Sequence, residues 1–295
     1  MKNRAGSWKG NRKPLSGFLA HHISIHKITF MNFSFIQITD HHLTESDTVL
    51  LDGFSTRHAF RSVLKHIAQN TGTNVDFIVS TGDIVENPTE TAYQSFLHMV
   101  NARNASAKIP GPISVSTEGL LNLPMYLLPG NHDDRDNFFK YLFPKSVSAN
   151  LMNAAFTHKD IQFICLDFGP HSKAKAHSET LDFLSRSLNV NLPSIVLMHH
   201  QLIKIGSRWL DEFIADDIHK FWNILSGHNV LGIFCGHIHT TYERIINNIP
   251  VFGLRSTACP FVMQDEPLAC LLPPHYRLVT VQNGILSTQV FEVPL

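Results

Sequence analysis

The chain has 295 residues, of which 43% are hydrophobic and 16% charged, and its formal net charge is zero. This composition is typical of a globular protein with enough apolar material for one large domain. No apolar stretch approaches the roughly 20 residues that a membrane span needs, which excludes a transmembrane helix. The four cysteines show no C-x-x-C spacing, which favours reduced core thiols in a cytoplasmic protein.

Basic residues are concentrated at the start of the chain. The first thirty residues hold six Lys or Arg and no acid, so the remainder carries 18 basic against 24 acidic side chains. An acidic body binds nucleic acid poorly without specific contacts, which argues against nucleic acid as a partner. Residues 1–30 lack the clean apolar core and cleavage site of a signal peptide. We therefore expect a disordered extension or an over-long start, followed by a single domain over residues 31–295.

The first part of the body alternates β-rich runs with amphipathic helices. Helices are predicted over residues 55–70, near 89–100, over 178–188 and over 209–225, between strands that end near residues 40, 83, 133, 168, 200 and 239. In the first helix Ser55 is a plausible N-cap. One buried face of that helix is expected to comprise Ala59, Phe60, Val63, Leu64 and Ile67.

The last part of the chain changes character. Residues 243–254 and 276–293 read as β-hairpins, and Asn283-Gly284 supplies the turn of the second. A βαβ first part with an antiparallel finish fits two packed sheets flanked by helices.

The connection Asn101–Leu123 is rich in Asn, Ser, Ala, Gly and Pro. A structureless loop of this size is commonly functional or disordered. Because it precedes a strand whose far end carries the candidate ligands, we interpret it as a surface insertion or partner contact rather than an active-site lid.

Seven residues with metal-ligand chemistry follow five of the strands. They are Asp40, His42, Asp83, Asn131, His199, His237 and His239. In open α/β sheets, functional groups collect at the carboxyl ends of strands, so five such ends can converge on one crevice. Carboxylate, amide and imidazole without thiolate suit Mn, Fe or Zn rather than a structural cysteine site. The sequence therefore predicts one metal site at this edge.

The order D-x-H, G-D-x-x-E, G-N-H-D, H, G-H-x-H resembles that of the calcineurin-like metallophosphoesterase superfamily. Within it, the chain is most similar to the class III cyclic nucleotide phosphodiesterases, the CpdA or Icc group. The similarity runs from about Phe33 to near the C-terminus and includes GLRSTACPFVM and PPHYRLVTVQNG. It implies a mixed α/β fold, a four-layer αββα sandwich of two mixed β-sheets flanked by helices.

The resemblance also implies two metal ions (Fe, Mn or Zn) and a division of ligands between them. By the family pattern, one ion is held by Asp40, His42 and His239, the other by Asn131, His199 and His237, and Asp83 bridges both. Such a pair can clamp a phosphate and activate a water, so that a metal-bridging hydroxide attacks phosphorus in line.

His132 is the non-ligand imidazole expected to hold the phosphate and to protonate the departing alkoxide. Asp133 is expected to orient His132. Together with His132, the residues predicted to border the substrate are His42, Asp83, Asn131 and His239.

Five further residues near the strand ends have competing interpretations. His41 should point to the opposite face of its strand end. His199 is preferred over His200 as the ligand, because the purple-phosphatase-like pattern uses the first His. Glu86 is read as a solvated or supporting carboxylate rather than a ligand, and Asp167 as a structural acid.

Three functions compete. The leading one is a dimetal phosphodiesterase that acts on a small diester, with 3′,5′-cyclic AMP hydrolysed to 5′-AMP. The second is a broader hydrolase of glycerophosphodiesters, phosphomonoesters or nucleic-acid ends. The third, a non-catalytic scaffold, is weakest because all seven ligand positions and His132 keep their residue types. The partner is then a small phosphodiester, and a homodimer is compatible with the sequence.

Overall fold

Two six-stranded mixed β-sheets form the centre of the fold in the computed structural model, which describes residues 32–70, 74–102, 112–117, 121–146, 149–268, 270 and 272–295. In spatial order, the first sheet consists of β12 (Ile285–Glu292), β11 (His275–Gln282), β1 (Phe33–Ile38), β2 (Phe77–Thr81), β4 (Leu121–Leu128) and β3 (Ile113–Thr117). The strands β1, β2 and β4 run parallel, and the other neighbours in this sheet pair antiparallel.

The second sheet repeats this plan. In spatial order, its strands are β5 (Ala154–His158), β6 (Ile161–Leu166), β7 (Ser194–Met198), β8 (Val230–Cys235), β10 (Ile249–Gly253) and β9 (Tyr242–Ile246). Here β6, β7, β8 and β10 are parallel, while β5 and β9 pair antiparallel at the two edges. Each sheet thus has a parallel centre whose strand ends can present functional groups at one edge.

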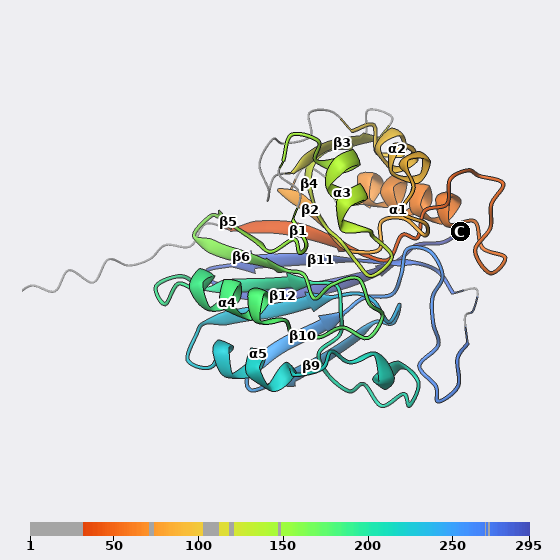
Figure 1. Cartoon of the computed structure of the whole chain (residues 1–295). Coiled ribbons are helices and arrows are strands. Elements are labelled where there is room, and N and C mark those ends of the chain that lie inside the picture. Colours follow the sequence, from red (N-terminus) through yellow and green to blue (C-terminus); the bar gives the residue numbers. More distant parts are fainter. Residues whose placement is uncertain are drawn as a thin grey trace, which may run out of the picture.

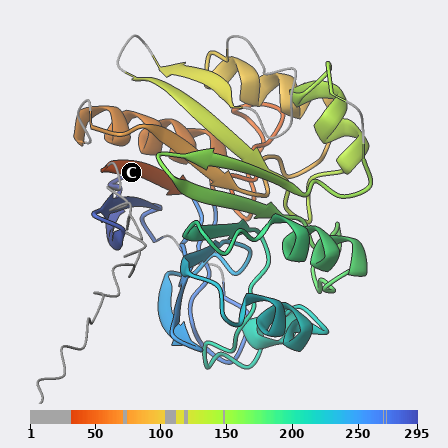
Figure 2. The same ribbon diagram turned by 90° about the vertical axis from the view of Figure 1, so that its left-hand side faces the viewer.

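Helices cover the outer face of each sheet. They are α1 (Thr56–Asn70), α2 (Glu90–Met99) and α3 (Arg135–Leu142) on the first sheet, and α4 (Ser178–Ser187) and α5 (Ile218–Leu225) on the second. Figure 2 shows the orange, yellow and light green helices on one side of the stacked sheets and the green and teal helices on the other. The predicted four-layer αββα sandwich is confirmed.

Three hydrophobic clusters fill the three interfaces between these layers. One lies between α1–α3 and the first sheet, one between the two sheets, and one between the second sheet and α4 and α5. In β1, Phe33 and Phe35 face the cluster between the sheets, while Ile36 and Ile38 face the helices. Because successive side chains of a strand alternate in direction, one apolar strand serves two interfaces.

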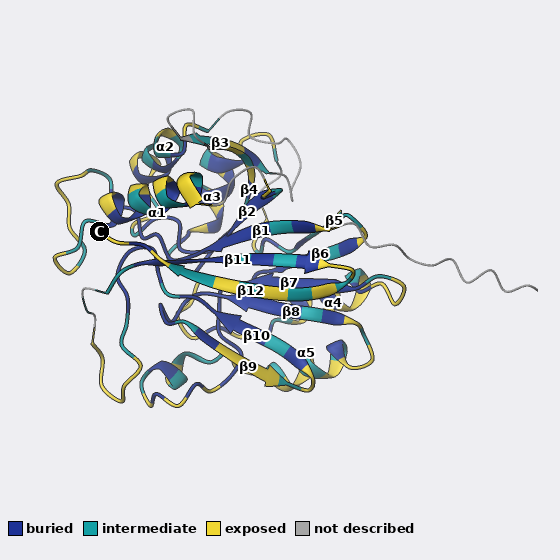
Figure 3. Ribbon diagram, turned by 180° about the vertical axis from the view of Figure 1, so that it is seen from behind, coloured by how far each residue is buried: buried dark blue, intermediate teal, exposed yellow. Residues whose placement is uncertain are grey.

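The edge strands differ from the central ones in exposure. Exposed residues alternate with partly buried ones along β12 and gather in the middle of β9, whereas β2 and β7 are buried throughout (Figure 3). Both predicted C-terminal hairpins form, as β9–β10 and β11–β12. Asn283 and Gly284 have φ values of 53° and 77°, which a tight type I′ turn requires.

Ser55 caps α1 as predicted, since its Oγ accepts a hydrogen bond from the backbone N of His58 at 3.4 Å. The predicted apolar face of this helix is buried. No described helix is long and apolar enough to cross a bilayer.

The predicted single helix over residues 209–225 is wrong. The chain forms a 3₁₀ turn, η1 (Leu210–Phe213), and then α5, with Asp217 between them at φ 60°. The break coincides with backbone pairing to a distant segment. Asp216 N donates to Ala174 O at 2.9 Å, and Ala176 N donates to Asp216 O at 3.0 Å. Amphipathic spacing alone cannot reveal such a tertiary contact.

The interpretation of Asn101–Leu123 as a structureless connection is also wrong in part. Residues 113–117 form β3, which pairs antiparallel with β4 from Ile113 opposite Met125 to Thr117 opposite Leu121. β3 lies at the edge of the first sheet, at the end of β4 away from the candidate ligands. Residues 103–111 and 118–120 lie outside the described residues, so the choice between partner contact and lid stays a prediction.

A chain that begins at Met31 is expected to fold and to hydrolyse substrate as the full chain does. Residues 1–31 lie outside the described part, and Asn32 already anchors the entry to β1: its Oδ1 accepts from Asn283 N at 3.1 Å and its carbonyl from Lys159 Nζ at 3.2 Å. Thermal unfolding and turnover of the two chains check this. A large fall in melting temperature or loss of soluble expression would show that the head packs onto the body.

Candidate metal centre

The seven predicted ligands lie together where the parallel strands of both sheets end. Asp40 and His42 follow β1, and Asp83 follows β2. The others are Asn131 after β4, His199 after β7, and His237 and His239 after β8. This edge is on the right-hand side of Figure 1, where the loops after β1 and before β11 project.

One group of acceptor atoms surrounds Nε2 of His42. It lies 3.0 Å from His239 Nε2 and 3.4 Å from Asp83 Oδ2, and His239 Nε2 lies 3.4 Å from Asp40 Oδ1. The ligand atoms of these four residues all lie within 4.8 Å of one another, and all four side chains are buried.

A second group surrounds Nε2 of His199. It lies 3.0 Å from Asn131 Oδ1, 3.3 Å from Asp83 Oδ2 and 3.3 Å from His237 Nδ1. Asp83 Oδ2 therefore belongs to both groups. The predicted ligand division would place one ion at each group, with Asp83 shared by both.

The hydrogen bonds on the far side of three imidazoles indicate what these groups can hold. His42 Nδ1 contacts Glu86 Oε2 at 2.7 Å, His239 Nδ1 the Cys259 carbonyl, and His199 Nδ1 the Thr81 carbonyl at 2.9 Å. Because carbonyl and carboxylate oxygens only accept, each neutral ring carries its proton on Nδ1 and turns the lone pair of Nε2 inward.

When these three rings are neutral, their inward-facing Nε2 atoms are acceptors, as are the side-chain oxygens of Asp40, Asp83 and Asn131. Two lone pairs 3.0 Å apart repel each other unless a cation lies between them. Ligands about 2.1 Å from one ion, at angles of 90° to 110°, lie roughly 3.0–3.4 Å from one another, which is the spacing of both groups. The arrangement of these ligand atoms therefore fits two cations, although the assignment of each residue as a ligand stays a prediction.

The backbone at the site is strained. Five of the predicted ligands have φ in the left-handed region: Asp40 at 53°, His42 at 44°, Asp83 at 51°, His237 at 72° and His239 at 49°. Such a conformation costs about 1 kcal/mol or more for a residue with a Cβ, so the surroundings must fix it. Backbone bonds between the first two loops do so, because Asp40 N donates to Gly82 O and His42 N to Asp83 O, both at 3.0 Å.

Two glycines allow the loops to approach. A Cβ at Gly130 would overlap the carboxylate and backbone N of Asp83, and a Cβ at Gly236 would overlap Thr39 and the carboxylate of Asp40. The first contact joins β2 to β4, and the second joins the two sheets. Both glycines belong to the motifs that contain the ligands, G-N-H-D and G-H-x-H.

The carboxylates of the cluster stay ionised. Burial by itself raises the pKa of Asp83, but the adjacent imidazoles of His199 and His42 hold it well below its usual range. The pKa of Asp40 is likewise lowered, because the imidazoles of His239 and His199 outweigh the effect of burial, which raises it. Burial lowers the pKa of His199, and the carboxylates of Asp83 and Asp40 raise it to about 9. A negative, buried cluster of this kind attracts cations.

His132 lies beside the cluster and outside both ligand groups. Its ring is edge-on to that of His42, with centroids 4.6 Å apart, and its side chain is 36% exposed. The ring Nδ1 lies 3.1 Å from the Glu86 carbonyl and must donate to it, which leaves Nε2 as the free ring nitrogen. Burial lowers the pKa of His132, while Asp83 and Glu86 together raise it above its usual value.

The expectation that Asp133 orients His132 is wrong. The Asp133 carboxylate accepts from Gly130 N at 2.9 Å, Ile84 N at 3.1 Å and Tyr93 OH at 2.9 Å, so it holds the loop rather than the imidazole. Glu86 takes the orienting role instead, through its carbonyl and through Oε2 at 3.4 Å from His132 Nδ1. Its carboxylate also holds His42, so the proposed supporting role of Glu86 agrees with its position.

The two other doubtful histidines belong to neither ligand group, although the His200 ring lies beside that of His237, with centroids 4.7 Å apart. His41 is buried against Phe60, and its ring nitrogens contact Thr257 Oγ1 at 2.7 Å and Ser80 Oγ at 2.8 Å. His200 Nε2 donates to the His171 carbonyl at 2.8 Å. This geometry is consistent with the choice of His199 over His200.

Asp167 is the buried partner of Arg135, as its structural interpretation requires. Arg135 Nε donates to Asp167 Oδ2 at 2.9 Å, and the two side chains are 7% and 1% exposed. The carboxylate also accepts from Met152 N at 2.8 Å. The pair links the end of β6 to the first turn of α3.

Replacing Arg135 by methionine is expected to lower the free energy of unfolding by about 3–5 kcal/mol, because it leaves the buried Asp167 carboxylate without its counter-charge. Urea unfolding measures this. Arg186→Met, on the exposed face of α4, is the matched control and should change stability little. Equal, small effects of the two changes would mean that the buried pair contributes nothing.

A pocket of about 210 Å³ opens over the cluster. Its lining includes His132 and the predicted ligands His42, Asp83, Asn131, His237 and His239, together with Ser172, Trp209, Leu210, Phe213, Ile238 and Phe261. The last six residues were not predicted. Trp209, Leu210 and Phe213 lie in the segment wrongly read as a continuous helix, so their place at the site could not be inferred.

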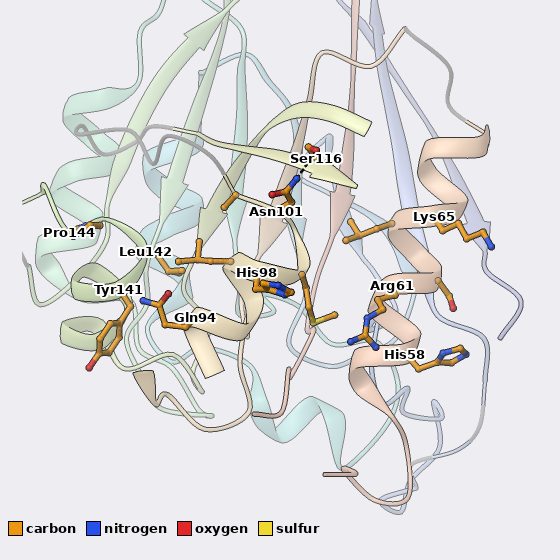
Figure 4. A pocket seen from close by; sticks show the side chains of 15 residues that line it. His58, Arg61, Lys65, Gln94, His98, Asn101, Ser116, Tyr141, Leu142 and Pro144 are labelled. Carbon is orange, nitrogen blue, oxygen red and sulfur yellow. Dashed lines mark hydrogen bonds between the residues drawn. The ribbon is translucent and has the colours of Figure 1, made fainter. Parts of the chain in front are cut away.

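A larger hollow, of about 1100 Å³, lies elsewhere, between α1, α2 and α3. Figure 4 shows Arg61 of α1 on the side that faces His98 of α2, and Gln94 of α2 beside Tyr141 and Leu142 of α3. None of the seven predicted ligands lines this groove. The larger hollow thus contains none of the predicted ligands, and the smaller pocket over the acceptor cluster is the candidate site.

The family model described as Calcineurin-like phosphoesterase matches residues 33–241. This span is more than half of the chain, so the protein belongs to the calcineurin-like phosphoesterase family. It is a metal-dependent hydrolase of phosphate esters, as its motifs predicted.

Individual relatives and a solved structure agree with this result. The chain is 29% identical over 270 residues to "3′,5′-cyclic adenosine monophosphate phosphodiesterase CpdA" of Haemophilus influenzae, which covers 88% of this chain and 89% of the relative. It is 26% identical over 235 residues to "Probable glycerophosphodiester phosphodiesterase GpdQ" of Arcobacter nitrofigilis, over 75% and 77% of the two chains. A dimetal phosphatase from Danio rerio has the same fold, with a TM-score of 0.57 at 12% identity over 89% of this chain and 99% of that one.

Proposed function

We propose that the protein is a dimetal phosphodiesterase that hydrolyses a small phosphodiester, with 3′,5′-cyclic AMP as its substrate and 5′-AMP as its product. The two acceptor groups that share Asp83 support this proposal most directly. The similarity to the CpdA of Haemophilus influenzae supports the choice of substrate.

Two ions held by the seven residues would neutralise the phosphate charge and increase the acidity of a bound water. Asp40, His42 and His239 would hold one, Asn131, His199 and His237 the other, and Asp83 both. We assign Fe, Mn or Zn as the metals from the oxygen and imidazole donors.

Two residues outside the ligand groups complete the proposed reaction: Glu86 orients His132, and His132 protonates the leaving group. Glu86 fixes the ring of His132 by accepting from Nδ1. The free Nε2 can then face the phosphate in the pocket and give a proton to the departing alkoxide. The backbone N of His132 donates to Asp83 Oδ1 at 2.8 Å, so this bond fixes the position of His132 relative to the shared carboxylate.

Hydrolysis rates across four substrates test the proposal. We expect the highest kcat/KM for cyclic AMP among cyclic AMP, cyclic GMP, glycerophosphoethanolamine and p-nitrophenyl phosphate. Higher activity on glycerophosphoethanolamine would favour the second candidate, a broader diesterase, which the similarity to GpdQ motivates. Hydrolysis of none of them by metal-loaded protein would overturn the proposal.

The scaffold interpretation has little support. A scaffold has no need to hold seven acceptor residues, six of them buried, in two overlapping groups, because their mutual repulsion costs stability without a cation. Metal analysis of the purified protein separates this case from the others, since a scaffold that lost its metals would contain none.

A further inference from the structure

Three aromatic side chains border the metal pocket on the side of His237 and His239. Trp209, Phe213 and Phe261 line the pocket, and we call them the aromatic wall. All three are partly exposed. They come from two loops, the η1 segment after β7 and the segment before β11.

The wall is continuous with the candidate ligands. The Phe261 ring stacks flat on His239, with centroids 4.3 Å apart and an angle of 6°, and the Phe213 ring is edge-on to His237 at 5.8 Å. Trp209 joins them, with its ring centroid 5.1 Å from that of Phe261 and 6.3 Å from that of Phe213. A ring bound against the wall would thus lie next to the phosphate position.

Core packing accounts for only part of this arrangement. Trp209 and Phe261 pack against the outer side of the cluster beneath α4 and α5, whereas Phe213 belongs to none of the three hydrophobic clusters of the described residues. Phosphate chemistry itself needs charged and polar groups. Partly exposed aromatic side chains that converge on a pocket more commonly bind an apolar or planar part of a ligand.

We propose that the aromatic wall binds the organic substituent of the diester by stacking, and that this substituent carries a planar heteroaromatic ring such as a nucleobase. The inference rests on the proposed function and specifies which part of the substrate each side of the pocket recognises. His132 lies against His42 and Glu86, and the wall lies against His237 and His239. The phosphate of the bound substrate would therefore lie between His132, the proton donor, and the nucleobase on the aromatic wall.

Stacking gives the wall a means of selection. Each of the bases has a flat π face, so an aromatic platform binds nucleotides with little preference among bases. Glycerol and ethanolamine substituents have no such face. The wall thus favours nucleotides over glycerophosphodiesters, a distinction that the metal cluster cannot make because it contacts only phosphate.

Binding of products to the Mn²⁺-loaded protein tests this inference without relying on turnover. We would measure dissociation constants for 5′-AMP and for inorganic phosphate by calorimetry in the wild type, Phe213→Leu and Trp209→Leu. The matched control is Phe183→Leu, a partly buried phenylalanine that packs on the same cluster as Trp209 but lies outside the pocket lining.

We expect 5′-AMP to bind more tightly than phosphate in the wild type, and each wall variant to weaken 5′-AMP roughly tenfold or more while phosphate affinity stays unchanged. Phe183→Leu should alter neither. Equal loss of both ligands, or unchanged 5′-AMP affinity in Phe213→Leu, would overturn the inference. Phe213 is partly exposed and outside the hydrophobic clusters, so this variant stays informative if Trp209→Leu fails to fold.

Failure of the proposed function would give a different result. If the protein hydrolyses diesters but binds 5′-AMP no more tightly than phosphate, the proposed role of the aromatic wall is refuted and the proposed phosphodiesterase function is retained. If 5′-AMP binding depends on the aromatic wall but the protein hydrolyses no diester, the proposed role of the wall is supported and the proposed phosphodiesterase function is refuted.

Discussion

Asp83→Ala protein is expected to lose both metal ions and, with them, detectable hydrolysis. The Asp83 carboxylate lies 3.4 Å from His42 Nε2 and 3.3 Å from His199 Nε2, so it is the one anion common to both acceptor groups. Without it, the second group keeps only neutral donors, Asn131 and two imidazoles, and the first keeps a single carboxylate from Asp40. Affinity for divalent cations should fall for both.

Metal content and turnover measured on one preparation check this result. Asp182→Ala, which removes an exposed acid on α4, is the control and should retain two ions and full activity. Asn131→Ala should weaken the binding of one ion more than that of the other, because Asn131 belongs only to the group around His199. Two tightly bound ions and full turnover in Asp83→Ala protein would show that the assignment is wrong.

His132→Ala is expected to slow cyclic AMP hydrolysis by roughly 10²–10⁴-fold, the usual loss when a general acid is removed. Metal content should not change, because His132 lies outside both acceptor groups. The loss should be smaller for bis-p-nitrophenyl phosphate, since p-nitrophenolate departs without a proton. His98→Ala, an exposed histidine in the groove between the helices, is the control.

The comparison of two substrates separates the roles open to His132. Equal losses on both substrates would contradict the acid role and leave phosphate positioning. A fall in metal occupancy would mean that His132 is a ligand. Glu86→Gln should reproduce only a small part of the unequal loss, because it changes the carboxylate 3.4 Å from His132 Nδ1 but keeps the Glu86 backbone carbonyl that accepts from the same atom.

Much of the fold could be predicted because its signals are local. Apolar runs that end in polar motifs, such as FSFIQITD before His41, mark buried parallel strands, and Asn283-Gly284 specifies a hairpin turn. The convergence of Asp40, Asp83 and His199 then follows, since parallel strands present their carboxyl ends at one edge.

The errors arose where long-range contacts decide the structure. The helix predicted over residues 209–225 is interrupted where its backbone pairs with Ala174 and Ala176, more than thirty residues away. β3 forms in a Gly- and Ser-rich stretch because β4 offers it a free edge. Sequence spacing contains no information on either partner.

The site shows the same limit. Asp133 is adjacent to His132 in sequence, but its carboxylate is occupied by Gly130 N, Ile84 N and Tyr93 OH. Glu86, 46 residues before His132, takes its place. Ligand types could thus be predicted from motifs, whereas the residues that orient them and shape the pocket depend on how the loops fold together.

The most direct test of the dinuclear site is an anomalous difference map from crystals grown with Mn²⁺. The predicted result is two peaks about 3.5–4 Å apart on either side of the Asp83 carboxylate, one beside His42 and His239 and one beside His199 and His237. A single peak, or peaks that do not contact Asp83, would contradict the dinuclear assignment on which the proposed reaction depends.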